Sequence, residues 1–155
     1  MNKILVQEAD FDLTTEVKIA RNHANNIGAV VSFVGTVRDL EDAPIRYMEL
    51  EHYPNMTKKA LESIALEAQK KWPIDNVVII HRVGKLEINE QIVLVITTAQ
   101  HRKEAFQACE FIMDYLKTRA PFWKKEYTND GKSSWVESKI SDQNEVKRWQ
   151  KTQNT

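Results

Sequence analysis

Hydrophobic and polar positions divide the chain into strand-like and helix-like segments. Residues 29–38 and 91–99 are almost continuously apolar, which predicts two largely buried strands. Residues 45–52 alternate between polar and apolar, which predicts a strand with one buried face. Shorter apolar runs at residues 3–7 and 76–83 predict two more strands.

Helical spacing of apolar residues marks three segments, at about residues 12–25, 54–72 and 101–120. Asp12 or Thr14 is a suitable N-cap for the first segment. Pro121 ends the third, because proline lacks the backbone donor that a helix needs. The third segment has two adjacent apolar stripes, which predict a helix pressed onto a sheet. The stripes contain Phe106, Cys109, Met113 and Leu116, and Ala105, Ala108, Ile112 and Tyr115.

The chain beyond Pro121 predicts a hairpin followed by a tail. Residues 122–128 and 133–137 are strand-like, and the Asp130-Gly131 dipeptide between them is typical of a hairpin turn. Residues 143–155 are polar and are expected to fray. Mixed helices and strands with a hairpin at the end predict an α+β fold with a mainly antiparallel sheet and packed helices.

Composition and charge narrow the class of protein. The chain has 155 residues, 42% of them hydrophobic, and equal numbers of basic and acidic residues, 22 of each. One domain without a broad nucleic-acid surface is therefore expected. No apolar run is long enough to span a membrane, and acidic residues come too early for a signal peptide. The single cysteine, Cys109, fits a reducing cytoplasm, and the histidine spacing predicts no metal site.

Basic residues gather where the predicted elements end. Arg38 ends a strand, and His101 and Arg102 open a helix, where free backbone N–H groups favour anions. Lys117 ends that helix and Lys124 opens the next strand, so the two ammonium groups can lower each other's pKa and serve as bases or nucleophiles. The alternative is a solvated basic helix end, since cations favour the C-terminus of a helix.

Aromatic residues alternate with lysines in the predicted hairpin. Phe122, Trp123, Tyr127 and Trp135 interleave with Lys124 and its neighbours, as in some RNA-binding strands. The zero net charge favours a different interpretation, in which these aromatic side chains cover the helix and close the core. Strand alternation also predicts that Lys125 faces away from Lys124 and into solvent.

Five segments closely resemble the large, catalytic subunit of molybdopterin synthase, the MoaE family. The similarity runs in order over residues 29–149, and the block around Lys117 and Lys124 is highly specific. The segments are FVGTVR at 33–38, LEHYPNMTKKAL at 50–61, IHRVG at 80–84, HRKEAF at 101–106 and DYLKTRAPFWKKE at 114–126.

This resemblance implies an α/β hammerhead fold and a cytoplasmic sulfurtransferase that forms a homodimer within a heterotetramer. A small ubiquitin-like carrier subunit presents sulfur on its C-terminal Gly-Gly thiocarboxylate. The large subunit transfers two sulfurs to cyclic pyranopterin monophosphate and so makes the dithiolene of molybdopterin, without a cofactor. We accordingly assign residues 1–140 to a single catalytic domain and residues 141–155 to a polar C-terminal tail.

The resemblance also assigns roles to individual residues. Lys117 and Lys124 match the family's two essential lysines. The other matching substrate contacts are Thr36, Val37, Arg38, His101, Arg102, Lys125, Glu126 and Lys139. Some relatives have arginine where Lys139 stands, contributed across the dimer, so a bidentate phosphate contact is weaker here.

Two other functions remain as alternatives, a non-catalytic adaptor that binds the carrier and a phosphate- or RNA-binding module. Cys109 lies on the apolar stripe of the third helix, so we expect it to be buried and not to carry sulfur.

Overall fold

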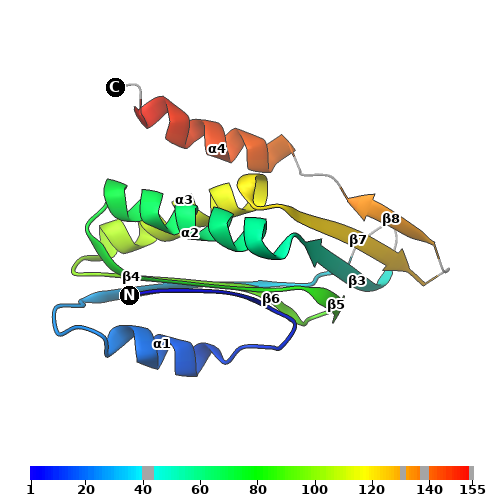
Figure 1. Ribbon diagram of the computed structural model, residues 1–155, viewed down its shortest axis with the longest axis horizontal. Helices are drawn as coiled ribbons and strands as arrows, with labels where there is room; N and C mark the ends of the chain where they lie inside the picture. Colours follow the sequence, from blue (N-terminus) through cyan, green and yellow to red (C-terminus); the bar gives the residue numbers. More distant parts are fainter. Residues whose placement is uncertain (40–43, 130–131, 137–139, 154–155) are drawn as a thin grey trace.

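The computed structural model describes residues 1–39, 44–129, 132–136 and 140–153. The elements follow the predicted order (Figure 1), with one further strand, at Gly84–Glu87, that the sequence pattern did not predict. Along the chain they are β1 (Asn2–Gln7), α1 (Leu13–Arg21), β2 (Ala29–Thr36), β3 (Ile45–His52), α2 (Pro54–Lys71), β4 (Ile74–Arg82), β5 (Gly84–Glu87), β6 (Gln91–Ala99), α3 (Arg102–Arg119), β7 (Phe122–Thr128), β8 (Ser133–Val136) and α4 (Ile140–Gln153).

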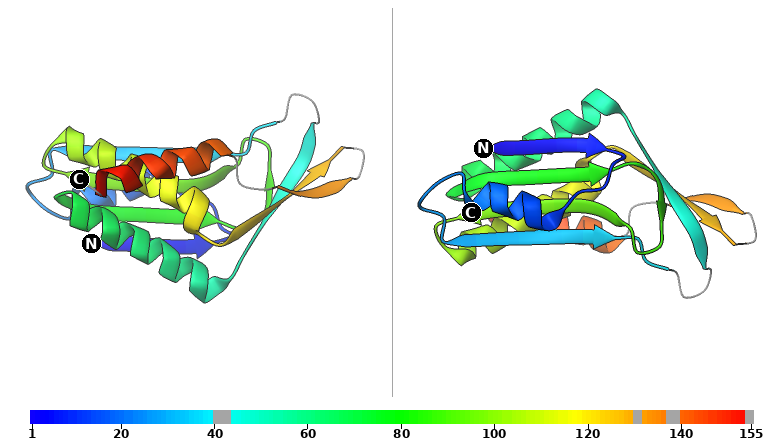
Figure 2. Two further views of the ribbon diagram at one scale, coloured as in Figure 1. Left: turned by 90° about the horizontal axis from the view of Figure 1, so that it is seen from above. Right: turned by 90° about the horizontal axis from the view of Figure 1, so that it is seen from below.

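The larger sheet has the strand order β1-β4-β6-β2. Strands β4 and β6 lie inside it, which explains why their sequences are almost continuously apolar. Helices α2 and α3 cover one face of this sheet and α1 covers the other (Figures 1 and 2). Successive residues of β4 pack on opposite faces of the sheet: Val77 and Ile79 face α2 and α3, while Val78 and Ile80 face α1.

The smaller sheet has the order β5-β3-β7-β8 and projects beyond one end of the larger sheet (Figure 2). A third core cluster, which includes Met48, Leu50 and Leu86, holds it against that end. Among the described strands, β1 pairs with β4 in parallel and the other pairs are antiparallel. The predicted α+β hammerhead with mainly antiparallel pairing is therefore confirmed. The sequence predicted one sheet, whereas the strands form two.

The last helix, α4, corrects the prediction of a frayed tail after residue 143. It packs over α3 (Figure 1), and its Val146 and Trp149 side chains are buried in the main core. Trp149 donates its indole N–H to Asp114 Oδ2 at 2.6 Å. Two buried residues three positions apart lie on one face of a helix and can hold it against the core, even when the rest of the helix is polar. The polar composition of this segment conceals that face. The assignment of residues 1–140 as the catalytic unit stays a prediction.

The predicted apolar stripes of α3 are buried except at Phe106, which is 61% exposed. Phe111, which was on neither stripe, is fully buried and contacts Trp72 and Trp149. The packing of α4 adds this side of α3 to the core.

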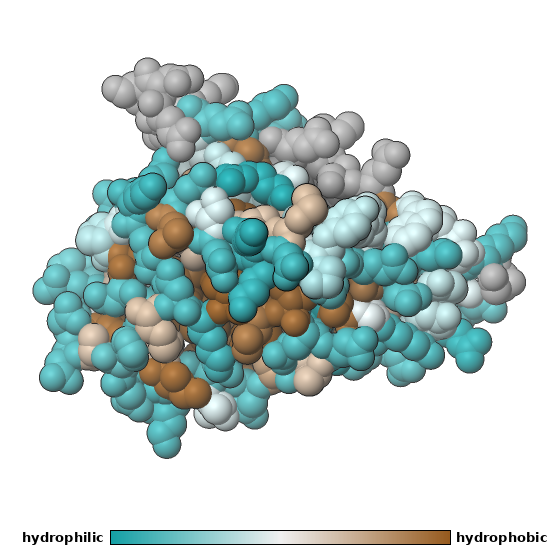
Figure 3. Space-filling model, in the orientation of Figure 1, coloured by the Kyte–Doolittle hydropathy of each residue, from teal (hydrophilic) through white to brown (hydrophobic). Residues whose placement is uncertain are grey.

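The surface in the orientation of Figure 3 is mostly polar, with hydrophobic side chains gathered in its middle, below α2. Over the described residues, no helix combines the length and the apolar character needed to cross a membrane.

Candidate active site

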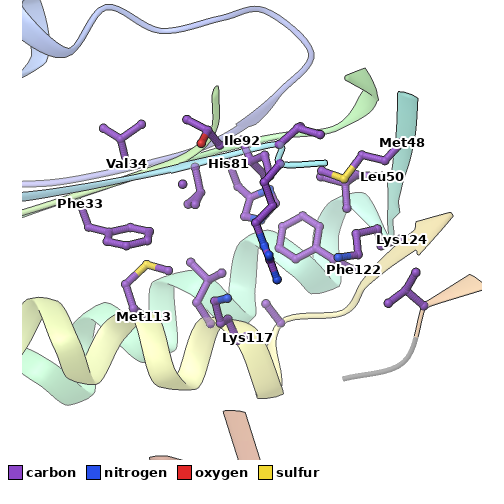
Figure 4. A pocket seen from close by; sticks show the side chains of 18 of the residues that line it. Phe33, Val34, Met48, Leu50, His81, Ile92, Met113, Lys117, Phe122 and Lys124 are labelled. Atoms are coloured by element: carbon purple, nitrogen blue, oxygen red, sulfur yellow. The ribbon is translucent and has the colours of Figure 1, made fainter. Parts of the chain in front are cut away.

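A pocket of about 660 Å³ lies where the two sheets meet the end of α3 (Figure 4). Its residues come from the end of β2, from β3 and β7, and from the last two turns of α3. The charged side chains that line it are Arg38, Lys117, Lys124 and Glu126. The remaining walls are mainly apolar, with Phe33, Met48, Leu50, Ile92, Met113, Leu116 and Phe122 among them.

The two lysines reach the pocket from the corner around Pro121. Helix α3 ends at Arg119 with Ala120 in an extended conformation, and β7 begins at Phe122. Lys117 is exposed and has no hydrogen bond or ion pair with another described residue. The Lys124 ammonium lies 3.8 Å from Glu126 Oε1. The predicted convergence of Lys117 and Lys124 is therefore present in the fold.

The segment Thr36–Arg38 enters the pocket through an irregularity in β2. The pairing of β2 with β6 shifts its register between Gly35 and Thr36. A Cβ atom on Gly35 would lie 2.9 Å from Val93 Cγ1, so the close approach of β2 to β6 requires glycine here. Beyond the shift, Val37 donates its N–H to the Glu90 carbonyl at 2.9 Å. This bulge redirects the chain and brings Thr36, Val37 and Arg38 to the pocket wall.

Lys125 lies outside the pocket, as strand alternation predicted. Lys124 and Glu126 face inward, whereas the Lys125 ammonium sits 5.4 Å from the Tyr127 ring centroid and 5.3 Å from the Trp135 ring centroid. The structure therefore separates Lys125 from the other matched residues of β7.

His101 and Arg102 do not line this pocket. His101 is the N-cap of α3, and Lys117 lies 16 positions further along the same helix, which corresponds to about 24 Å. A single chain therefore does not bring His101 or Arg102 to the two lysines. Lys139 lies outside the described residues.

The aromatic residues of the hairpin are divided between the two faces of the smaller sheet. Phe122 is half-buried and packs against the core, as expected. Trp123 is 38% exposed and Trp135 is 54% exposed, so the prediction that they close the core is wrong. Tyr127 stacks on Tyr47 with ring centroids 4.5 Å apart. Among the described elements, none of the helices packs on this face of the smaller sheet, so these side chains stay partly exposed.

Cys109 is buried, as the sequence predicted, and does not line the pocket. Burial raises the pKa of its thiol to about 12, and the neighbouring Glu110 carboxylate adds to the shift. The thiol is therefore protonated and unreactive at neutral pH. Among the described residues, no cluster of three or more His, Cys, Asp or Glu side chains could hold a metal ion.

His81 is the pocket residue that the sequence reasoning missed. It lies on β4 with its ring stacked on Phe122, at a centroid distance of 3.7 Å. Burial lowers its pKa to about 4, against a raising effect from the hydrogen bond to the Arg82 carbonyl. The signal was available, because His81 alternates with the buried Val77 and Ile79 on the side of β4 that faces α3.

Comparison with known proteins identifies the family. The family model described as "MoaE protein" matches residues 6–119. The chain belongs to the MoaE family. It is 53% identical over 150 residues to the molybdopterin synthase catalytic subunit of Ralstonia nicotianae, covering 96% of this chain and 85% of that protein.

Solved structures of MoaE relatives have the same fold. The molybdopterin biosynthesis MoaE protein from Burkholderia ambifaria superposes with a TM-score of 0.81 at 55% identity, covering 96% of this chain and 98% of the other. Molybdopterin synthase from Staphylococcus aureus superposes with a TM-score of 0.80 at 33% identity, covering 88% and 98%. The resemblance seen in the sequence motifs is thereby confirmed, along with the fold class.

Proposed function

We propose that this chain acts as the catalytic subunit of molybdopterin synthase, a cytoplasmic sulfurtransferase. In this role it transfers two sulfurs to cyclic pyranopterin monophosphate, one from the thiocarboxylated C-terminus of each of two small carrier subunits, which are left as carboxylates, and so forms the dithiolene of molybdopterin. The observation that carries the proposal is the convergence of Lys117, Lys124 and Arg38 on one pocket.

The charges of the pocket suit the charges of both reactants. The substrate phosphate and the carrier thiocarboxylate are anions, and three cationic side chains line the pocket against one carboxylate, Glu126. Arg38 offers a planar fork that matches phosphate oxygens. Lys117 and Lys124 can stabilise the oxyanion that develops at the carrier carbonyl and can move protons as sulfur is added.

The carrier reaches this site by inserting its extended C-terminal Gly-Gly tail. Residues without side chains can thread into a pocket that larger residues would not enter, and the apolar walls exclude water from the thiocarboxylate. The folded body of the carrier then remains at the mouth of the pocket, outside the residues that line it.

We assign the contacts of His101 and Arg102 to the pocket of a second copy of the chain. Both side chains are exposed and lie about 24 Å along α3 from Lys117, so they are too far from the lysines of their own chain. In a symmetric homodimer, a residue far from its own pocket can complete the partner's. Lys139 is proposed to act in the same way, across the dimer.

A reconstitution assay tests the function. The purified protein, the thiocarboxylated carrier and cyclic pyranopterin monophosphate should together yield a dithiolene product with two added sulfurs, detected by mass spectrometry. The Lys117→Ala variant should lose nearly all turnover at unchanged thermal stability, because Lys117 is exposed and takes part in no described hydrogen bond.

The matched control uses carrier that ends in an ordinary carboxylate, which supplies no sulfur. Binding of the thiocarboxylated carrier without any conversion would instead support the adaptor function.

A further inference from the structure

His81 lies in the pocket wall, and only one of its two ring nitrogens, Nδ1, forms a hydrogen bond with another described residue. Its side chain is 5% exposed, and its Nδ1 lies 2.8 Å from the Arg82 carbonyl oxygen. One face of the imidazole is occupied by the Phe122 ring, with an interplanar angle of 17°. These two contacts fix the orientation of the ring.

The contact with Arg82 also determines the tautomer. A carbonyl oxygen only accepts hydrogen bonds, so Nδ1 carries the proton and Nε2 presents a lone pair. No hydrogen bond to Nε2 occurs among the described residues. His81 is one of the residues that line the pocket, so its imidazole forms part of the pocket wall and Nε2 is the ring atom left to accept a hydrogen bond there.

The pocket has an excess of donors over acceptors. Arg38, Lys117 and Lys124 only donate hydrogen bonds, and Glu126 is already close to Lys124. A reduced pterin carries several N–H groups besides its anionic phosphate, and each buried N–H requires an acceptor. Apolar and aromatic side chains, Phe33, Met113 and Phe122 among them, make up much of the remaining lining and can pack against a planar ring.

We propose that His81 is a substrate-binding residue whose Nε2 accepts a hydrogen bond from an N–H group of the pterin heterocycle. The inference rests on the proposed function. The low pKa of His81 is consistent with this role, because a neutral imidazole keeps its lone pair throughout the physiological pH range.

Two variants separate the nitrogens of His81. The side-chain amide of His81→Asn can still donate to the Arg82 carbonyl but does not extend to the position of Nε2. The longer amide of His81→Gln can place an oxygen near that position. Calorimetry should show cyclic pyranopterin monophosphate binding His81→Asn about three- to ten-fold more weakly than wild type, with most of the affinity recovered in His81→Gln.

A second titration, with the carrier subunit in place of the pterin, identifies the source of the N–H group. Carrier affinity should be equal in wild type and both variants. A loss confined to the carrier titration would overturn the proposal, since the donor would then be a backbone amide of the carrier tail.

Nitrogen-15 NMR of the wild-type protein provides a readout that does not depend on how the variants fold. The unprotonated Nε2 resonance of His81 should move toward lower frequency when the pterin binds. An unmoved resonance, or equal pterin affinity in wild type and His81→Asn, would overturn the proposal. A wild-type protein that neither binds nor converts the pterin would contradict the proposed function itself.

Discussion

At the residue scale, adjacent lysines on β7 have opposite environments. Lys124 lines the pocket near Glu126, whereas Lys125 lies over aromatic rings on the other face of the sheet. Two neighbours in sequence therefore have different surroundings here, and side-chain alternation predicted which of them faces the pocket.

This difference predicts contrasting effects for two alanine variants. Lys124→Ala should reduce turnover in the reconstituted assay by at least about a hundred-fold, because it removes a cation that acts on the transition state. Lys125→Ala should keep turnover within about two- to three-fold of wild type, since surface cation–π contacts contribute little. Equal losses in the two variants would show that Lys125 also reaches the reactants.

Cys109 gives a second prediction at this scale. A sulfur-transfer enzyme with one cysteine invites a persulfide mechanism, but this thiol is buried and its pKa is raised to about 12. Cys109→Ala should keep most of its turnover and lose about 1 kcal/mol of stability to the small cavity. Denaturant unfolding and single-turnover kinetics check the two parts.

Mass spectrometry of wild-type protein during turnover supplies the decisive control. A persulfide on Cys109, or a folded Cys109→Ala variant without activity, would contradict sulfur delivery by the carrier thiocarboxylate.

At the element scale, α4 is fixed to α3 by few but specific contacts. Trp149 is 8% exposed, packs edge-on against Trp72 and Phe111, and donates to Asp114. The Arg148 guanidinium adds ion pairs to Glu110 at 3.0 Å and to Asp114 at 2.9 Å on the exposed side, where such pairs contribute less.

Trp149→Ala is therefore expected to destabilise the protein by about 3–5 kcal/mol, the usual range for removing a buried aromatic side chain. The matched control is Trp135→Ala, which removes the same side chain from a position that is 54% exposed and should cost less than about 1 kcal/mol. Urea unfolding measures both values. A Trp149→Ala variant as stable as Trp135→Ala would mean that α4 does not stay docked in solution.

At the scale of the whole molecule, α3 connects two groups of basic residues that one chain holds apart. Lys117 lies at the pocket, and Arg102 lies at the opposite end of the helix. If both groups bind the same substrate, the functional unit contains two copies of the chain.

Mixed dimers of two variants with weakened pterin binding, assayed at a limiting pterin concentration, test this arrangement. Arg38→Ala and Arg102→Ala should each weaken pterin binding roughly ten- to hundred-fold, the effect of losing one charge-assisted contact. When the two variants are combined in one dimer, one pocket contains both substitutions and the other contains neither. About half of the wild-type turnover should then return. Mixed dimers as inactive as the separate variants would place Arg38 and Arg102 in the same pocket of one chain.

Local sequence patterns determined the elements of this protein and their order. Alternation and helical spacing predicted every strand except the short β5, and the first three helices. Asp12 caps α1 by accepting from the Thr15 N–H at 2.8 Å, and Pro121 marks the corner after α3. The motif around Lys117 and Lys124 also indicated the family. These features depend on residues within a few positions of one another, so the sequence contains them directly.

Only the tertiary structure decided which faces meet. The polar composition of α4 gave no sign that Trp149 would be buried, because burial depends on what covers a side chain and not on its own neighbours in sequence. Alternation along β4 indicated the face on which His81 lies, but only the packed chain placed its ring against Phe122 in the pocket wall. The sequence indicated that His101 and Lys117 bind the same anionic substrate, but they lie at opposite ends of α3, which keeps them apart within one chain. A sequence pattern gives the orientation of a residue within its element, whereas distances between elements follow from the packing of the whole chain.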